Sequence, residues 1–130
     1  MRVALIGCGK RKGSKAVRAK DLYTGPLFAL ARRYAERRCD AFLILSAKHG
    51  VVDPDRVLGP YEQSMGSLTR AERAEWARLA LARVTEVARR AEIVFLAGSD
   101  YEGAVDGLSV EAPLRGLSIG ARMKWLKENA

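Results

Sequence analysis

The stretch Leu43-Ile44-Leu45-Ser46-Ala47-Lys48-His49-Gly50-Val51 guides the interpretation of the whole chain. The apolar run from Phe42 to Leu45 is typical of a strand covered on both faces, as in a parallel sheet. A hydroxyl, an ammonium group, an imidazole and a glycine follow at once, so they fall at the carboxyl end of that strand. Ligands of open α/β sheets bind at this edge. The stretch therefore predicts a parallel sheet with a ligand site at its carboxyl edge.

Two other apolar runs resemble the first and alternate with helical patterns. We expect parallel strands at residues 2–7, 42–46 and 92–97, and helices at about 26–38 and 69–90. Pro26 suits a first helical turn, and Thr69-Arg70-Ala71-Glu72 is a capping box. The alternation predicts an α/β fold, a three-layer Rossmann-like sandwich with a mostly parallel central sheet.

The remaining segments are assigned by their local pattern. The second helix should bury an apolar face that recurs at helical spacing: Trp76, Leu79, Ala80, Val84 and Val87. Residues 51–66, which contain two prolines, predict a long loop across the sheet edge. We expect a short edge strand at 108–113 and a last helix through about Asn129. The segment 118–122 resembles the hairpin of helix-hairpin-helix DNA binders.

Composition limits the class of protein. At 130 residues and 48% hydrophobic, the chain should form one domain, residues 1–130, without metal or disulfide support. The cysteines Cys8 and Cys39 are too few for a disulfide framework, and a single histidine argues against structural zinc. No leader or membrane-spanning run is apparent. We expect a soluble, cytoplasmic protein with no metal, no cofactor and no membrane partner.

The charge points to a polyanionic partner. Lys and Arg number 23 against 15 Asp and Glu, which gives a net charge of +8 and a pI near 9.9. The alternative is that arginines merely fill solvated helix faces. After the first strand, glycines at 7, 9 and 13 alternate with Lys10, Arg11, Lys12 and Lys15, a pattern that predicts an anion cradle or, alternatively, a solvated basic loop.

Parallel strands should bring three polar clusters together at one edge. We expect one pocket lined by Cys8, Lys10, Ser46, Lys48, His49 and Ser99. Tyr61 and Glu62, from the long loop, would form its lid.

Several motifs resemble the YaaA family, the peroxide stress proteins, and its short related domains of unassigned function. The matching residues are Lys10, Lys20-Asp21-Leu22-Tyr23, Leu45-Ser46, Gly50-Val51, Pro54, Pro60-Tyr61, Met65-Gly66, Ala97 and Tyr101. The resemblance spans about residues 3–105 and implies DNA binding linked to damage, modification or oxidative stress. The chain departs from YaaA at Lys48, His49 and Glu62, so no chemistry follows from the resemblance.

Two functions remain open, and in both the partner is DNA or a nucleotide. In the binding hypothesis, phosphates are held by residues at the sheet edge, and Tyr23, Tyr61 or Tyr101 stacks on a base. The phosphate-binding set is Cys8, Gly9, Lys10, Lys12, Ser46, Lys48, Tyr61 and Ser99.

In the enzyme hypothesis, the protein cleaves the N-glycosidic bond of a nucleotide or of a modified or damaged DNA base. Glu62 or Asp100 would stabilise oxocarbenium-like charge or activate water, and His49 or Lys48 would help the base leave. The alternative for His49 is a residue that caps a turn. Cys8 is either a packed small residue or a nucleophile, and a redox-sensing Cys8 is compatible with either hypothesis.

Overall fold

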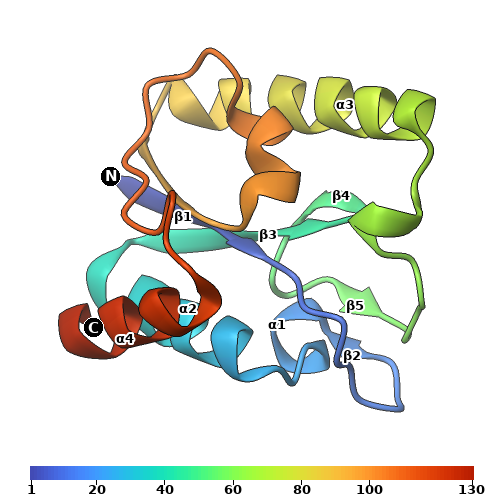
Figure 1. Ribbon diagram of the computed structural model, residues 1–130, viewed down its shortest axis with the longest axis horizontal. Helices are drawn as coiled ribbons and strands as arrows, with labels where there is room; N and C mark the ends of the chain where they lie inside the picture. The colour runs from blue at the N-terminus through green and yellow to red at the C-terminus, as the bar shows by residue number, and fades with distance from the viewer.

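A four-stranded, mostly parallel sheet forms the centre of the molecule. The computed structural model describes residues 1–130, and the sheet has the strand order β4-β3-β1-β6 (Figure 1). Strand β1 (Arg2–Gly7) pairs in parallel with β3 (Ala41–Ser46) on one side and with β6 (Glu92–Leu96) on the other. The three predicted strands and their parallel direction are confirmed.

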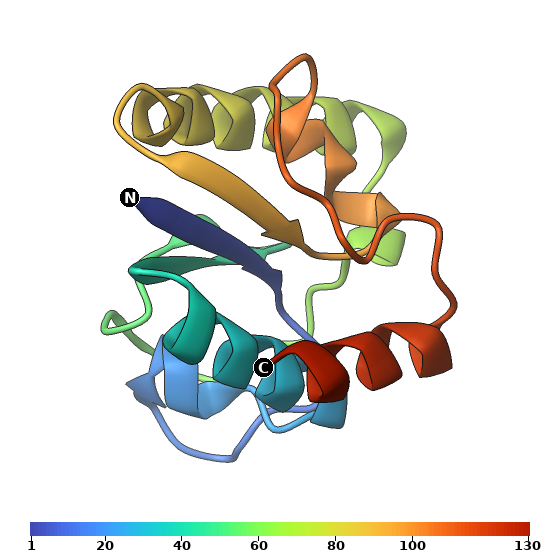
Figure 2. The same cartoon turned by 90° about the vertical axis from the view of Figure 1, so that its left-hand side faces the viewer.

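Helices cover both faces of this sheet. Figure 2 shows α3 (Arg70–Ala88) and the 3₁₀ segment η2 (Ser99–Val105) on one side, and α2 (Pro26–Arg38) and α4 (Ile119–Asn129) on the other. Side chains alternate between the two faces along each strand, and the strands are apolar at nearly every position. Both faces of the sheet are therefore apolar, and helices pack on each of them. In β1, Val3 and Leu5 join the core beneath α3, and Ala4 and Ile6 join the core against α2 and α4.

The predicted helices form where their signals lie. Pro26 occupies the first turn of α2. The Thr69 side chain accepts a hydrogen bond from the Glu72 N–H, and the Glu72 carboxylate accepts one from the Thr69 N–H, which is the expected capping box of α3. Leu79 differs from expectation, because its side chain is 55% exposed although its spacing predicts burial.

The segment after β3 is a hairpin and not simply a loop. β4 (Gly50–Val52) pairs antiparallel with β3, with Ser46 opposite Gly50. Gly50 has a φ of +72°, the left-handed conformation that ends a three-residue hairpin turn. Sequence periodicity missed this strand because it is only three residues long.

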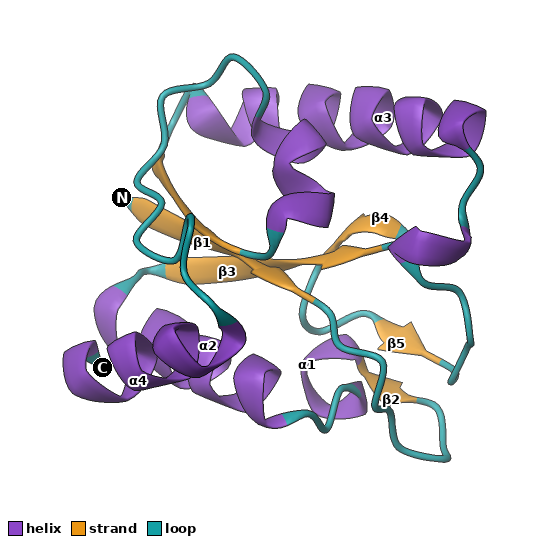
Figure 3. Cartoon of the chain, in the orientation of Figure 1, coloured by secondary structure: helices purple, strands orange, loops and turns teal.

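Short elements complete the chain. β2 (Val17–Arg18) and β5 (Val57–Leu58) pair antiparallel beside the short helix α1 (Ala19–Leu22), away from the main sheet (Figure 3). The 3₁₀ segment η1 (Met65–Ser67) precedes α3.

The edge strand predicted at 108–113 is reduced to one parallel bridge, between Glu111 and Val94. Pro113 lacks the N–H that a continuing ladder needs, which limits extension of the pairing. None of the helices combines the length with the apolar character that a membrane-spanning segment requires.

Candidate functional site

The carboxyl ends of β1, β3 and β6 meet at one edge of the sheet (Figure 1). The register aligns Gly7 with Leu45, and Ile6 with Leu96. The residues that follow the three strands therefore start from neighbouring positions, as the sequence predicts. Their side chains, however, have quite different surroundings.

Ser46 is a fully buried anchor. Its Oγ accepts a hydrogen bond from the His49 N–H at 3.1 Å and is hydrogen-bonded to the Tyr61 hydroxyl at 2.6 Å. Its carbonyl accepts a hydrogen bond of 2.8 Å from the Trp76 indole N–H. Ser46 thus joins the hairpin turn, the Tyr61 loop and α3. Because it is 0% exposed, it supports the surface residues and does not itself face a ligand.

Tyr61 is the centre of a chain of hydroxyl and thiol groups. Its hydroxyl lies 2.5 Å from the Tyr23 hydroxyl and 3.9 Å from the Cys8 Sγ. The Cys8 Sγ also lies 3.3 Å from the Tyr101 hydroxyl. Burial is the main cause that raises the pKa of both Tyr61 and Tyr101, so both phenols stay protonated at neutral pH. Tyr61 belongs to the interior of the site and does not form a lid.

Two ammonium groups converge on the ring of Tyr61. Lys12 Nζ lies 4.4 Å from the ring centre, and Lys48 Nζ lies 5.7 Å from it. Lys12 comes from the loop after β1 and donates to the carbonyl of Lys10 at 3.2 Å. Lys48 lies at the exposed tip of the β3–β4 turn. Neither lysine forms an ion pair with a carboxylate, in contrast to Lys20, which pairs with Asp55 at 3.0 Å.

The three tyrosines differ in how far they are buried. Tyr23 is only 4% exposed, so it cannot stack on a base in this structure. Tyr61 is half-buried, with the two lysines near its ring and the His49 ring perpendicular to it at 5.2 Å. Tyr101 is also half-buried and packs edge-on against Trp76 with ring centres 5.7 Å apart. Stacking of a base on Tyr61 or Tyr101 stays a prediction.

The proposed catalytic residues are not brought into contact. The His49 side chain forms no hydrogen bond with Glu62 or Asp100, and the Asp100 carboxylate lies 3.8 Å from the guanidinium of Arg73. The Glu62 side chain is exposed and has no ion-pair partner. The His49 N–H bonds Ser46, which agrees with the turn-capping alternative. Burial, Arg56 and Lys48 lower the pKa of His49, so its imidazole is neutral at pH 7.

The other predicted residues lie apart from this centre. Lys10 and Ser99 are exposed, and a Cβ added at Gly9 would meet nothing within 4 Å. Cys8 and His49 line separate cavities. The structure thus brings together Cys8, Lys12, Ser46, Lys48, His49 and Tyr61 as neighbours through Tyr61, without the single pocket that was expected. No three His, Cys, Asp or Glu side chains are placed to hold a metal ion.

Arg122 is a residue of this edge that sequence reasoning did not assign. It lines a cavity of about 160 Å³ with Cys8 and Tyr101. One Nη lies 3.2 Å from the position that a Cβ on Gly98 would take, and its Nε donates to the Leu117 carbonyl. Ser118 accepts from the Ala121 N–H as the N-cap of α4, so the segment 118–122 starts a helix and does not form a DNA-binding hairpin. Arg122 could not be assigned from sequence because α4 lies near the end of β1 only in the folded protein.

Fold and site define an α/β protein with a mostly parallel sheet and a basic, hydroxyl-rich carboxyl edge. The chain belongs to the family described as "Family of unknown function (DUF6884)", which it matches over residues 3–128. This finding corrects the resemblance to YaaA, because DUF6884 is a different family and nothing links the chain to YaaA. The link to DNA damage, modification or oxidative stress was implied only by that resemblance, and it stays a prediction.

One curated relative provides a second comparison. The chain is 38% identical over 73 residues to "Uncharacterized protein YfjM" of Bacillus subtilis (strain 168). The aligned part covers 51% of this chain and 49% of that protein, so the match spans about half of the relative's length.

Proposed function

We propose that this protein binds a phosphate-bearing ligand, a nucleotide or a nucleic acid, at the carboxyl edge of its sheet. The observation that carries this proposal is the convergence of the Lys12 and Lys48 ammonium groups on the ring of Tyr61, with no carboxylate to neutralise either of them. Both ammonium groups lie close to the same ring, and neither has a carboxylate as counter-charge. A bound phosphate would supply that counter-charge, and its attraction to each ammonium is stronger near a protein surface than in bulk water.

The surrounding charge favours the same class of ligand. Lys10, Arg11 and Lys15 lie on the same loop as Lys12 and form no ion pair within 4.0 Å, whereas Arg18, a few residues later, lies 3.8 Å from Asp55. The whole chain carries a net charge of +8. Such a field raises the local concentration of a polyanion and accelerates its association. A cytoplasmic location, where nucleotides and nucleic acids are abundant, suits this proposal.

The topology supports the position of the site. We infer a three-layer Rossmann-like sandwich, because the chain passes from β1 to β3 on one side and returns to β6 on the other side of β1. Ligands of such sheets bind beyond the carboxyl ends of the strands, near the point where the strand order reverses. Cys8 follows β1 at this point, and its thiol contacts the Tyr61 and Tyr101 hydroxyls.

The N-glycosidic alternative has less support. It needs a carboxylate and an acid close to one another, and His49 contacts neither Glu62 nor Asp100. It stays a prediction, which a base-release assay tests: Glu62→Gln or Asp100→Asn should retain binding and abolish release. Absence of free base from nucleotides and from modified DNA would remove this alternative.

Titration with labelled single- and double-stranded DNA and with nucleotides tests the binding proposal. Fluorescence anisotropy and calorimetry should show binding at low salt that weakens as salt rises from about 50 to 200 mM, since phosphate contacts release counterions. If no ligand binds even at the lowest salt, the positive charge is only compositional and the proposal is wrong.

A further inference from the structure

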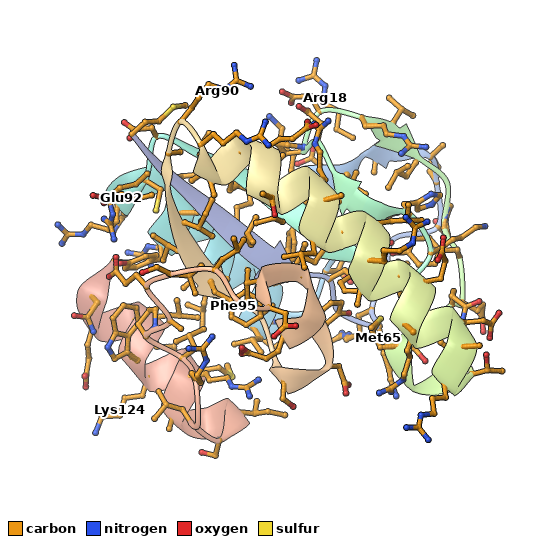
Figure 4. All side chains as sticks on the ribbon, turned by 90° about the horizontal axis from the view of Figure 1, so that it is seen from above. Arg18, Met65, Arg90, Glu92, Phe95 and Lys124 are labelled. Carbon is orange, nitrogen blue, oxygen red and sulfur yellow. The ribbon has the colours of Figure 1, made fainter.

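A cavity of about 300 Å³ lies next to Lys48, between α3 and the β3–β4 hairpin. Its volume is at the lower end of the range for small-molecule sites, about 300–1,000 Å³. Figure 4 views the molecule from the side of α3, the helix that forms one wall of this cavity. The residues that line it fall into an apolar group and a polar rim.

The apolar group consists of Val51, Trp76, Leu79 and Ala80. Leu79 is the feature that most needs explaining, because its side chain is 55% exposed on a helix whose apolar spacing predicts its burial. The indole N–H of Trp76 is already bonded to the Ser46 carbonyl, so the indole contributes only apolar surface here. An apolar or aromatic group of a ligand would cover Leu79 and remove that surface from water.

The rim carries cations without partners. Lys48 lines the cavity from the hairpin turn, and Arg83 lines it from α3. Neither side chain forms an ion pair. By contrast Arg78, on the same helix, pairs with Glu75 at 2.6 Å. A ligand that fits therefore combines an apolar part with negative charge.

His49 adds hydrogen bonding to this rim. Its ring contacts Tyr61 and also lines the cavity. Burial, Arg56 and Lys48 lower its pKa, so it is neutral and can both donate and accept a hydrogen bond. The polar edge of a nucleobase also carries both donors and acceptors, so a neutral imidazole can pair with it. An imidazolium could only donate.

We propose that this cavity is the base subsite of a nucleotide whose phosphate is held by Lys12 and Lys48. The inference rests on the proposed function and deepens it, because it names a mononucleotide unit with an accessible base as the ligand. Lys48 connects the two parts of the site: its ammonium faces the Tyr61 ring at 5.7 Å, and its side chain lines the cavity. Base and phosphate of one nucleotide would then occupy adjacent positions.

Calorimetric titration compares a panel of nucleoside monophosphates with ribose 5-phosphate, which has the same phosphate and no base. At least one nucleoside monophosphate should bind about tenfold more tightly or better. In a Trp125→Phe variant, where Trp76 is the remaining tryptophan, that nucleotide should change the indole fluorescence and ribose 5-phosphate should not.

The variant Leu79→Gln places a neutral polar amide in the cavity and should remove this preference for the base while leaving ribose 5-phosphate binding nearly unchanged, because no charge is added beside Lys48. Ala82→Gln is the control, since Ala82 is exposed on the same helix and does not line the cavity. Circular dichroism confirms that both variants fold.

The outcomes separate the two proposals. If nucleotides and ribose 5-phosphate bind equally, or if Leu79→Gln retains the preference, the base subsite is wrong and phosphate binding stands. If none of these compounds binds, and DNA does not bind either, the proposed function itself has failed.

Discussion

The ammonium group of Lys12 lies 4.4 Å from the centre of the Tyr61 ring, although the two residues belong to loops on different strands. The hydroxyl group of the same tyrosine is hydrogen-bonded to the buried Ser46 side chain. The Tyr61 ring therefore connects the Lys12 ammonium group to the interior of the domain. A rigid aromatic support of this kind preorganises a positive charge at the surface, with a modest cation–π contribution of about 0.5–1 kcal/mol.

Ser46→Ala should lower the free energy of unfolding by about 1–3 kcal/mol, because it leaves the Tyr61 hydroxyl and the His49 N–H without their shared partner. Urea unfolding followed by circular dichroism measures this change. The control is Ser109→Ala, at an exposed serine with no side-chain hydrogen bond. Equal stability of the two variants would mean that Ser46 is not an anchor.

Gly50→Ala should destabilise the hairpin by about 1–2 kcal/mol, because its φ of +72° places a Cβ in the unfavourable left-handed region. Gly59→Ala makes the same change where φ is not positive and where a Cβ would meet nothing within 4 Å. Thermal unfolding of both variants compares the two positions. Similar losses at both glycines would contradict the assigned turn.

His49 is the single histidine, so its NMR signal reports one pKa directly. Burial and the nearby cations lower that pKa in the folded state below the ordinary value of 6.5. The unfolded chain then binds more protons, so this group reduces stability as pH falls from 6.5 through the folded pKa and has no effect above 6.5. An imidazole that titrates at or above 6.5 in the folded protein would contradict this environment.

A bound phosphate should reverse part of that pKa shift. Negative charge next to Lys48 and His49 stabilises the imidazolium, so saturating nucleotide should raise the His49 pKa. The same NMR titration, repeated with inorganic sulfate at equal ionic strength, separates specific binding from screening. An unchanged pKa under saturating nucleotide would place the phosphate elsewhere.

The main sheet and the longer helices could be predicted because their signals are local. The run Phe42–Leu45 and the box Thr69–Glu72 determine structure through burial and capping within a few residues. β4 was missed because a strand of three residues shows no periodicity. The edge strand predicted at 108–113 was too long, because only Glu111 of that segment pairs with β6.

The site was harder to predict than the fold. Residues that follow parallel strands do start at the same edge, but Ser46 turns inward, and Asp100 approaches Arg73. Arg122 and Leu79 acquire their surroundings only when α4 and α3 pack on the sheet. No spacing in the sequence reports those contacts.

The central claim is that Lys12 and Lys48 hold a phosphate, and a pair of double variants tests it most directly. Lys12→Gln with Lys48→Gln removes the two ammonium groups beside the Tyr61 ring, whereas Lys10→Gln with Lys15→Gln removes the same charge from exposed positions of the loop that carries Lys12. Calorimetry at one fixed salt concentration should show the first variant losing at least about tenfold in nucleotide affinity and the second losing little. Equal losses in the two variants would contradict the claim, because binding would then depend on net charge and not on the site at Tyr61.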